Sequence, residues 1–166
     1  MGISKKVEEL IQMEQKARMG GGQAKVDKQH ATGKLTARER MDLLLDAGSF
    51  VELGMFVQHQ CHDFGMEQNR PWGDGVMAGY GKIDGRLVYV YAQDFTVLGG
   101  TIGHTGAAKI CSVSKLAREA GAPIIGLIDS GGGRIQEGSS TYGAVFAENV
   151  LASGVVPQIA AIMGSC

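Results

Sequence analysis

The feature that most constrains the fold of this chain is a glycine-rich turn that directly follows an apolar run. The run, residues 123–128, has the length and isoleucine content of a buried strand. Asp129 and Ser130 then lead into three glycines, where the backbone turns sharply and leaves its N–H groups uncovered. A helix is expected from about Ile135 to Ser153. A strand, a bare turn and a helix start together suit a phosphate or an oxyanion that forms during a reaction.

Length and composition exclude several classes of protein. The 166 residues suffice for one domain with its own core, and a formal net charge of −1 does not indicate a nucleic-acid-binding protein. No apolar stretch is long enough to span a bilayer, and the N-terminus shows neither a signal core nor a transit peptide. Three cysteines without a CxxC motif predict reduced thiols. We therefore expect a cytoplasmic protein, or one of the mitochondrial matrix in a eukaryote.

The first 48 residues are predicted to form a helical arm. Residues 4–19 have the pattern of an amphipathic helix that ends at three glycines, and residues 23–31 form a short polar helix. Thr36 and Glu39 have the spacing of a capping box and open a third helix, which ends near Gly48. The composition changes at residue 49, so we expect an arm at residues 1–48 and a core at residues 49–166.

The core is predicted to be an α/β domain with parallel crossovers. Asp84 and Gly85, between two apolar runs, predict a hairpin turn. A second glycine-rich turn and a helix that ends at Gly121 separate this hairpin from the next strand. The strands are expected at residues 50–54, 74–83, 86–93, 123–128 and 155–163. Because a core strand lies three residues before the end, we expect the chain to be a fragment of a longer protein.

The glycine turn at residues 99–106 lacks both common nucleotide-binding fingerprints. Its spacing does not fit GxGxxG, and no Gly-Lys-Ser/Thr follows it. A tight turn and a ligand-binding loop remain equally compatible with it. No metal site is expected either, because the cluster of His59, Cys61, His62 and Asp63 has no distant second pair of ligands.

Ser130 is interpreted as a turn residue rather than a nucleophile. No Gly-x-Ser-x-Gly elbow surrounds it, and none of the four histidines has an evident role in a triad. Arg134 is compatible with an anionic ligand, but an ion pair with Asp129 or Glu137 explains it at least as well.

Several motifs together resemble the biotin-dependent acyl-CoA carboxyltransferases. This family includes the β subunit of propionyl-CoA carboxylase and the α subunit of methylmalonyl-CoA decarboxylase. The resemblance covers nearly the whole chain in order, and it would place the chain in the N-terminal part of a protein about three times longer with two crotonase-like halves. The motifs are GKLTARER (residues 33–40), DLLLDAGSF (42–50), GDGV (73–76), DFTVLGG (94–100), DSGGGRIQEG (129–138) and GVVPQI (154–159).

The resemblance implies a crotonase-like ββα superhelix after the helical arm, and a carboxyl transfer between biotin and the α-carbon of a short acyl-CoA. Backbone N–H groups of Gly132 and Gly133 would stabilise the thioester enolate. The family usually has alanine at the position of Gly133 and often proline at that of Ser165, and the second oxyanion donor would lie beyond Cys166. Carboxylase and decarboxylase are not distinguished.

The resemblance also implies binding sites and partners. Coenzyme A would lie along Gly99, Gly100 and Gly103, with basic side chains at its phosphates. The partners would be a biotin carrier protein, further copies in a homo-oligomer with an active site shared between subunits, and a membrane subunit in a sodium-pumping decarboxylase. Alone, this chain is expected to be inactive. The basic candidates are Lys34, Arg38 and Lys109.

Two other classes of function remain open at this point. A stand-alone crotonase-like hydratase or hydrolase would need an acid–base carboxylate near the turn, and Glu137 and Glu148 are the candidates. A non-catalytic module that binds coenzyme A or a nucleotide would need no such group.

Overall fold

The computed structural model describes residues 2–138 and 141–166, with side chains from residue 4 onward. Five α-helices, five strands and four 3₁₀ turns are found in these residues. In chain order they are α1 (Gly2–Arg18), α2 (Gln23–Ala31), α3 (Ala37–Leu44), β1 (Val51–Glu52), η1 (Asp63–Gln68), η2 (Trp72–Gly75), β2 (Val76–Ile83), β3 (Arg86–Gln93), η3 (Leu98–Gly100), α4 (His104–Ala120), β4 (Ile124–Ile128), η4 (Ile135–Glu137), α5 (Thr141–Ala152) and β5 (Gln158–Ile162).

The strands form one mixed sheet in the order β1-β2-β3-β4-β5. The pairs β1–β2 and β2–β3 are antiparallel, whereas β3–β4 and β4–β5 are parallel and are connected through α4 and α5. Asp84 and Gly85 connect β2 to β3 with φ angles of 50° and 75°, and a type I′ turn requires positive φ at both positions. The predicted hairpin, parallel crossovers and α/β class are therefore confirmed.

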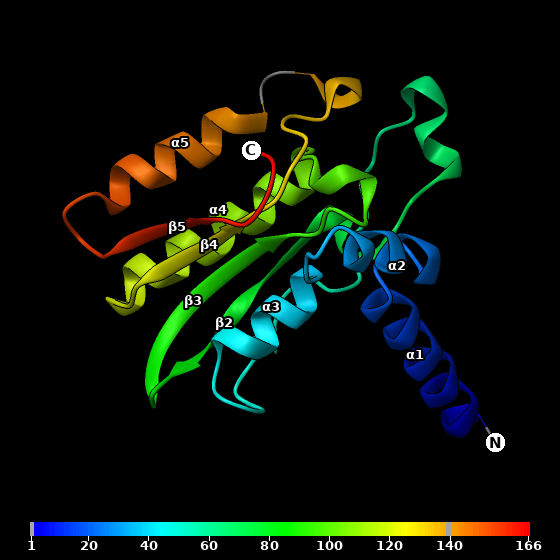
Figure 1. Cartoon of the computed structure of the whole chain (residues 1–166), viewed down its shortest axis with the longest axis horizontal. Coiled ribbons are helices and arrows are strands. Elements are labelled where there is room, and N and C mark those ends of the chain that lie inside the picture. Colours follow the sequence, from blue (N-terminus) through cyan, green and yellow to red (C-terminus); the bar gives the residue numbers. More distant parts are fainter. Residues whose placement is uncertain (1, 139–140) are drawn as a thin grey trace.

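Helices cover both faces of the sheet (Figure 1). On one face, Met41 of α3 belongs to a core cluster with Val90 and Leu127. On the other face, Ile110 of α4 packs with Ala78 and Ile124, and α5 packs on α4 through Val145. The alternation of side chains along β2 and β4 thus supplies one cluster to each side.

The helix ends follow the sequence closely. The Thr36 hydroxyl accepts a hydrogen bond from the Glu39 amide (3.3 Å), and the Glu39 carboxylate accepts one from the Thr36 amide (2.7 Å), so the capping box is confirmed. Gly121 ends α4 in the left-handed conformation, with φ of 65°. Figure 1 shows α1 pointing away from the rest of the chain.

The helix predicted from Ile135 to Ser153 is wrong at its start. After the three glycines the chain forms only the short turn η4, and α5 begins at Thr141. Gly138 has φ of 80°, which an α-helix does not tolerate. The N-terminal end of a long helix therefore does not lie directly at the glycine turn. The first strand is also shorter than predicted, at Val51–Glu52.

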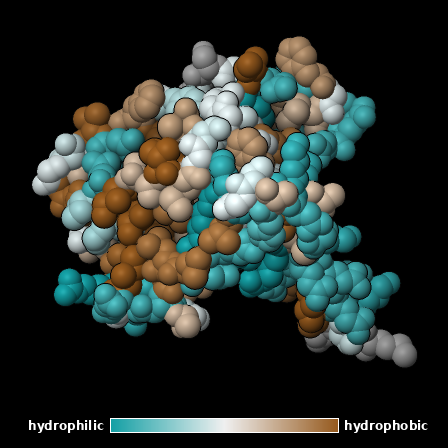
Figure 2. All heavy atoms as spheres, viewed as in Figure 1, coloured by the Kyte–Doolittle hydropathy of each residue, from teal (hydrophilic) through white to brown (hydrophobic). Residues whose placement is uncertain are grey.

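Apolar side chains gather on the face of the sheet that Figure 2 shows, over β3 to β5. Ile159 of β5 pairs with Ile125 and is 52% exposed. Among the described residues, no helix has the length and apolar character that a membrane span requires.

Candidate active site

Three turns meet where the parallel strands β3, β4 and β5 end. The Gly131 amide donates to the Gly99 carbonyl (2.8 Å), which joins the turn after β4 to the turn after β3. The Ser130 amide donates to the Ser165 carbonyl (2.7 Å), which joins it to the turn after β5. Crevices at the carboxyl ends of parallel strands are the usual ligand sites of α/β sheets.

The two glycine turns form a short parallel bridge between Ile102 and Gly133. The Ile102 amide donates to the Gly132 carbonyl (3.0 Å), and the Arg134 amide donates to the Ile102 carbonyl (2.9 Å). The amide of Gly133 points away from this bridge, as alternate residues of a strand do, and donates to no acceptor in residues 2–138 and 141–166. Gly133, a half-buried residue, therefore has an N–H group that none of the described residues accepts.

The amide of Gly132 is already used within the turn. It donates to the Ser130 hydroxyl oxygen (3.0 Å), and that hydroxyl donates in turn to the Gly100 carbonyl (2.7 Å). Ser130 is only 4% exposed. The interpretation of Ser130 as a turn residue is confirmed. Of the two predicted oxyanion donors, Gly133 is the one whose amide is free among the described residues.

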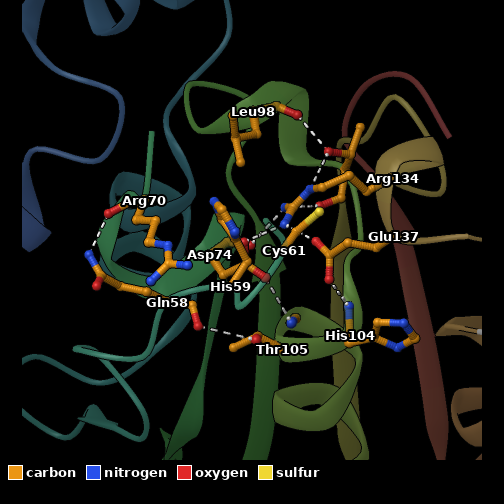
Figure 3. A network of polar contacts seen from close by, with 12 residues as sticks. Gln58, His59, Cys61, Arg70, Asp74, Leu98, His104, Thr105, Arg134 and Glu137 are labelled. Carbon is orange, nitrogen blue, oxygen red and sulfur yellow. Dashed lines mark hydrogen bonds and ion pairs between the residues drawn. The ribbon is translucent and has the colours of Figure 1, made fainter. Parts of the chain in front are cut away.

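Arg134 stabilises the turn after β4 through buried ion pairs instead of facing a ligand. Its Nη1 lies 2.5 Å from Oδ1 of the fully buried Asp74 and 2.7 Å from Oε1 of Glu137. Glu137 Oε2 accepts the His104 amide at 2.9 Å, so the network reaches the start of α4 (Figure 3). Burial raises the pKa of Asp74, and the Arg134 charge opposes that rise. The predicted pairing of Arg134 with Glu137 is confirmed, whereas Asp129 pairs elsewhere.

Asp129 anchors the arm to the end of β4. Its carboxylate is fully buried and accepts from Arg40 Nη2 of α3 at 2.7 Å and from Gln29 Nε2 of α2 at 3.1 Å. Nζ of the partly exposed Lys34 lies 3.4 Å from Asp129 Oδ1. Gly164 lies so close that a Cβ there would be 2.0 Å from Asp129 Oδ1. Helices of the arm and the turns after β4 and β5 thus converge on one carboxylate.

The three predicted coenzyme A glycines differ in their surroundings. Gly99 is half-buried and borders a cavity. Gly100 is buried, with φ of 62°, and a Cβ there would lie 2.3 Å from the Asp129 carbonyl oxygen. A Cβ on Gly103 would lie 2.1 Å from Glu137 Oε1. Gly100 and Gly103 therefore permit close packing, and only Gly99 is open to a ligand.

The three predicted basic residues also differ in exposure and in their partners. Lys34 is partly exposed, beside the Phe95 ring at 5.6 Å from its centroid. Arg38 forms an ion pair with Glu52 at 2.8 Å. Lys109 is buried, donates to the carbonyls of Val76 and Gly73, and has its pKa lowered to about 8 by burial. In this structure the Lys109 ammonium faces carbonyl oxygens and is not available to a phosphate.

A cavity of about 360 Å³ lies between α2 and the turn after β3. Two of its lysines, Lys25 and Lys28, were missed from the sequence. Their spacing of three places them on one face of α2, and the short polar composition of that helix was the signal. The residues that line the cavity are Lys25, Lys28, Gln29, Thr32, Lys34, Phe95, Thr96 and Gly99.

The chain is similar over nearly its whole length to known carboxylase and decarboxylase subunits. Residues 28–166 match the family model described as "Carboxyl transferase domain". The chain is 57% identical over 163 residues to the propionyl-CoA carboxylase beta chain of Roseobacter denitrificans, covering 96% of this chain and 32% of that protein. It is 54% identical over 167 residues to methylmalonyl-CoA decarboxylase subunit alpha of Veillonella parvula, covering 99% and 33%. The chain thus spans about a third of the length of the curated relatives it matches.

A solved structure is similar over the same region. Transcarboxylase 12S, described as a hexamer with hydrolysed methylmalonyl-coenzyme A bound, superposes with a TM-score of 0.94 at 48% identity. The match covers 96% of this chain and 32% of that one. With a family model matched over residues 28–166 and the same mixed α/β arrangement, this chain belongs to the carboxyl transferase domain family.

Proposed function

We propose that this chain forms the acyl-CoA side of a carboxyltransferase that moves a carboxyl group between biotin and the α-carbon of a short acyl-CoA. The observation that carries the proposal is the hydrogen bond from Gly131 to Gly99. It places a free amide, at Gly133, and a lysine-lined cavity, at Gly99, on two segments in direct contact. A thioester carbonyl and the phosphates of one coenzyme A ester need these two sites close together.

The Gly133 amide would donate a hydrogen bond to the thioester oxygen, on which negative charge develops when a carboxyl group is lost or added at the α-carbon. A backbone donor costs no reorganisation when it is already held in place, as the bridge to Ile102 holds this one. Gly132 supports it indirectly, because its amide is bonded to Ser130 and its carbonyl to Ile102. A second donor would complete the hole.

The phosphates of coenzyme A would bind in the lysine-lined cavity. Lys25, Lys28 and Lys34 supply positive charge there, and the Phe95 ring, 38% exposed, offers a surface on which an adenine stacks. The volume lies within the range of small-molecule sites. The cavity fits an anionic, partly aromatic ligand, and Arg38 and Lys109 are less suited because neither lines it and Lys109 is buried.

Biotin on a carrier protein would supply or accept the carboxyl group. No described residue of this chain is assigned to it, in keeping with an active site shared between subunits of a homo-oligomer. We further propose that residues 49–166 are the first part of a crotonase-like domain, preceded by an arm at residues 1–48, in a cytoplasmic or mitochondrial-matrix enzyme. A membrane subunit would join only in a decarboxylase of the sodium-pumping kind.

A stand-alone hydratase has less support. Both oxygens of Glu137 are engaged, one by Arg134 and one by the His104 amide. Glu148 pairs with Arg118 of α4 at 3.5 Å. Neither carboxylate is a free acid or base beside Gly133.

Binding tests the cavity. Lys25→Glu/Lys28→Glu is compared by calorimetry with Lys5→Glu/Lys6→Glu, a matched change on the exposed face of α1. The first pair should weaken coenzyme A binding about tenfold or more, about 1.4 kcal/mol, and the second should not. Equal Kd values for the two variants would exclude this cavity as the phosphate site.

Carboxyl transfer is tested in a chimera. This chain replaces the matching third of the Roseobacter propionyl-CoA carboxylase beta chain, and avidin-sensitive carboxylation of propionyl-CoA is measured. Activity above the level without biotin carrier supports the proposal. A folded, assembled chimera that transfers no carboxyl group to any short acyl-CoA would contradict it.

A further inference from the structure

The ring of Tyr142 lies against the backbone of Gly133. A Cβ built on Gly133 would be only 2.9 Å from Tyr142 Cε2, so the ring occupies the volume next to Gly133 that a side chain would need. The amide of Gly133 donates to no acceptor among residues 2–138 and 141–166. Tyr142 is therefore the side chain nearest to the position that a Cβ on Gly133 would take, next to this amide.

The ring is held in place from two sides. It stacks on Phe146 with ring centroids 5.9 Å apart and an interplanar angle of 23°. It also packs against the core cluster of α4, together with the buried Val145 of the same helix. Tyr142 is the second residue of the helix α5, which packs along α4, so its position follows that of the core rather than that of a loop.

A ligand at Gly133 has little freedom of placement. A carbonyl oxygen bound there sits about 2.9 Å from the amide nitrogen, which brings its carbon and the next atoms into contact range of whatever flanks the amide. The bridge to Ile102 closes the opposite side of the Gly133 backbone. The Tyr142 ring edge bounds the side toward which a Cβ of Gly133 would project.

From this geometry we propose that Tyr142 is a specificity-determining residue that limits the size of the acyl group whose carbonyl oxygen binds Gly133. The inference rests on the proposed function, because it takes an acyl thioester as the ligand. Glycine at position 133 and a ring at position 142 act as one unit, since a Cβ at 133 displaces the ring.

Acyl-CoA esters of different length test the inference with the whole 166-residue chain. Kd is measured by calorimetry for propionyl-CoA and hexanoyl-CoA with wild type, Tyr142→Ala and Tyr142→Phe. One methylene group is worth about tenfold or more in a fitted apolar pocket. Tyr142→Ala should therefore lower the ratio of the Kd for hexanoyl-CoA to the Kd for propionyl-CoA about tenfold or more. Tyr142→Phe keeps the ring and should leave the ratio unchanged.

A double-mutant cycle distinguishes a Tyr142 ring that limits the acyl site from one that only stabilises the fold. Gly133→Ala should weaken propionyl-CoA binding severalfold in the wild-type background and much less beside Tyr142→Ala, because the clash with Cε2 is then absent. Thermal unfolding of each variant shows that the chain is folded.

The outcomes are distinct for the two proposals. If wild type binds propionyl-CoA but Tyr142→Ala leaves the length ratio unchanged, or if the two substitutions are additive, Tyr142 does not limit the acyl group. If folded wild type binds no acyl-CoA ester, the proposed function fails, and the inference fails with it.

Discussion

Removing Arg40 should destabilise the whole chain, because its guanidinium neutralises a fully buried carboxylate near the site. Arg40 Nη2 lies 2.7 Å from Asp129 Oδ2, and the two side chains are 4% and 0% exposed. Arg40→Met keeps the aliphatic part of the side chain and leaves the Asp129 charge without its main partner.

The expected cost follows from this geometry. Two unit charges 2.7 Å apart attract by about 6 kcal/mol at an effective dielectric constant of about 20. Breaking one side of a buried pair typically costs about 3–5 kcal/mol. Lys34 at 3.4 Å and Gln29 at 3.1 Å still contact Asp129, so the lower end applies, about 3 kcal/mol. For a chain of this size, the midpoint of thermal unfolding should fall by roughly 6–12 °C.

Urea and thermal unfolding followed by circular dichroism measure the loss. Arg18→Met is the control, because its pair with Glu14 has a similar distance of 2.8 Å but exposed side chains, and it should lose no more than about 0.5 kcal/mol. Adding Asp129→Asn to Arg40→Met should recover stability by removing the uncompensated charge. A loss for Arg40→Met no larger than for Arg18→Met, or a further full loss on adding Asp129→Asn, would refute the reasoning.

Two further substitutions probe close packing and burial. Gly164→Ala would place a Cβ 2.0 Å from Asp129 Oδ1 and should cost about 1–3 kcal/mol, whereas Gly143→Ala, with open space in α5, should be neutral or stabilising by urea unfolding. Burial lowers the pKa of Lys109 to about 8, so the folded state binds fewer protons than the unfolded state between about pH 8 and 10.5. Stability should therefore gain about 3 kcal/mol from this group as pH rises through that window. Lys109→Met should abolish the gain and Lys115→Met, at an exposed position, should not; equal pH profiles of the two variants would contradict the prediction.

The parts of the fold that depend on neighbouring residues could be predicted from the sequence. The capping box at Thr36, the hairpin turn at Asp84 and the end of α4 at Gly121 each depend on a few consecutive residues. Apolar runs also identified β2 to β5, because the length and apolar content of a run are enough to indicate a strand, even for β5, whose side chains are mostly exposed.

The errors lie where distant residues decide the structure. Arg134 opens a helical pattern, yet its guanidinium is bound by Asp74, sixty positions earlier, and the chain turns at Gly138 before α5 begins. A lysine is usually exposed, and only the packing of α4 on η2 shows that Lys109 is buried. A single sequence does not reveal such contacts.

The site itself was only partly predictable. The glycine turns stood out by composition, and family resemblance assigned Gly132 and Gly133 a role that stays a prediction. Which of the two amides is free depends on the Ser130 hydroxyl, whose direction the sequence does not reveal. Lys25 and Lys28 were missed because nothing local links α2 to the turn after β3.

The bridge between Ile102 and Gly133 has a consequence for dynamics. The amides of Ile102, Gly131 and Arg134 each bond across the two turns, so none of them opens without separating both segments. Hydrogen exchange at these three amides should therefore be slow and share one opening free energy, as in a single cooperative unit. A ligand held at Gly99 alone would slow exchange at Arg134 as well. Binding at one end of the site would thus raise the opening free energy at the other end without any change in shape.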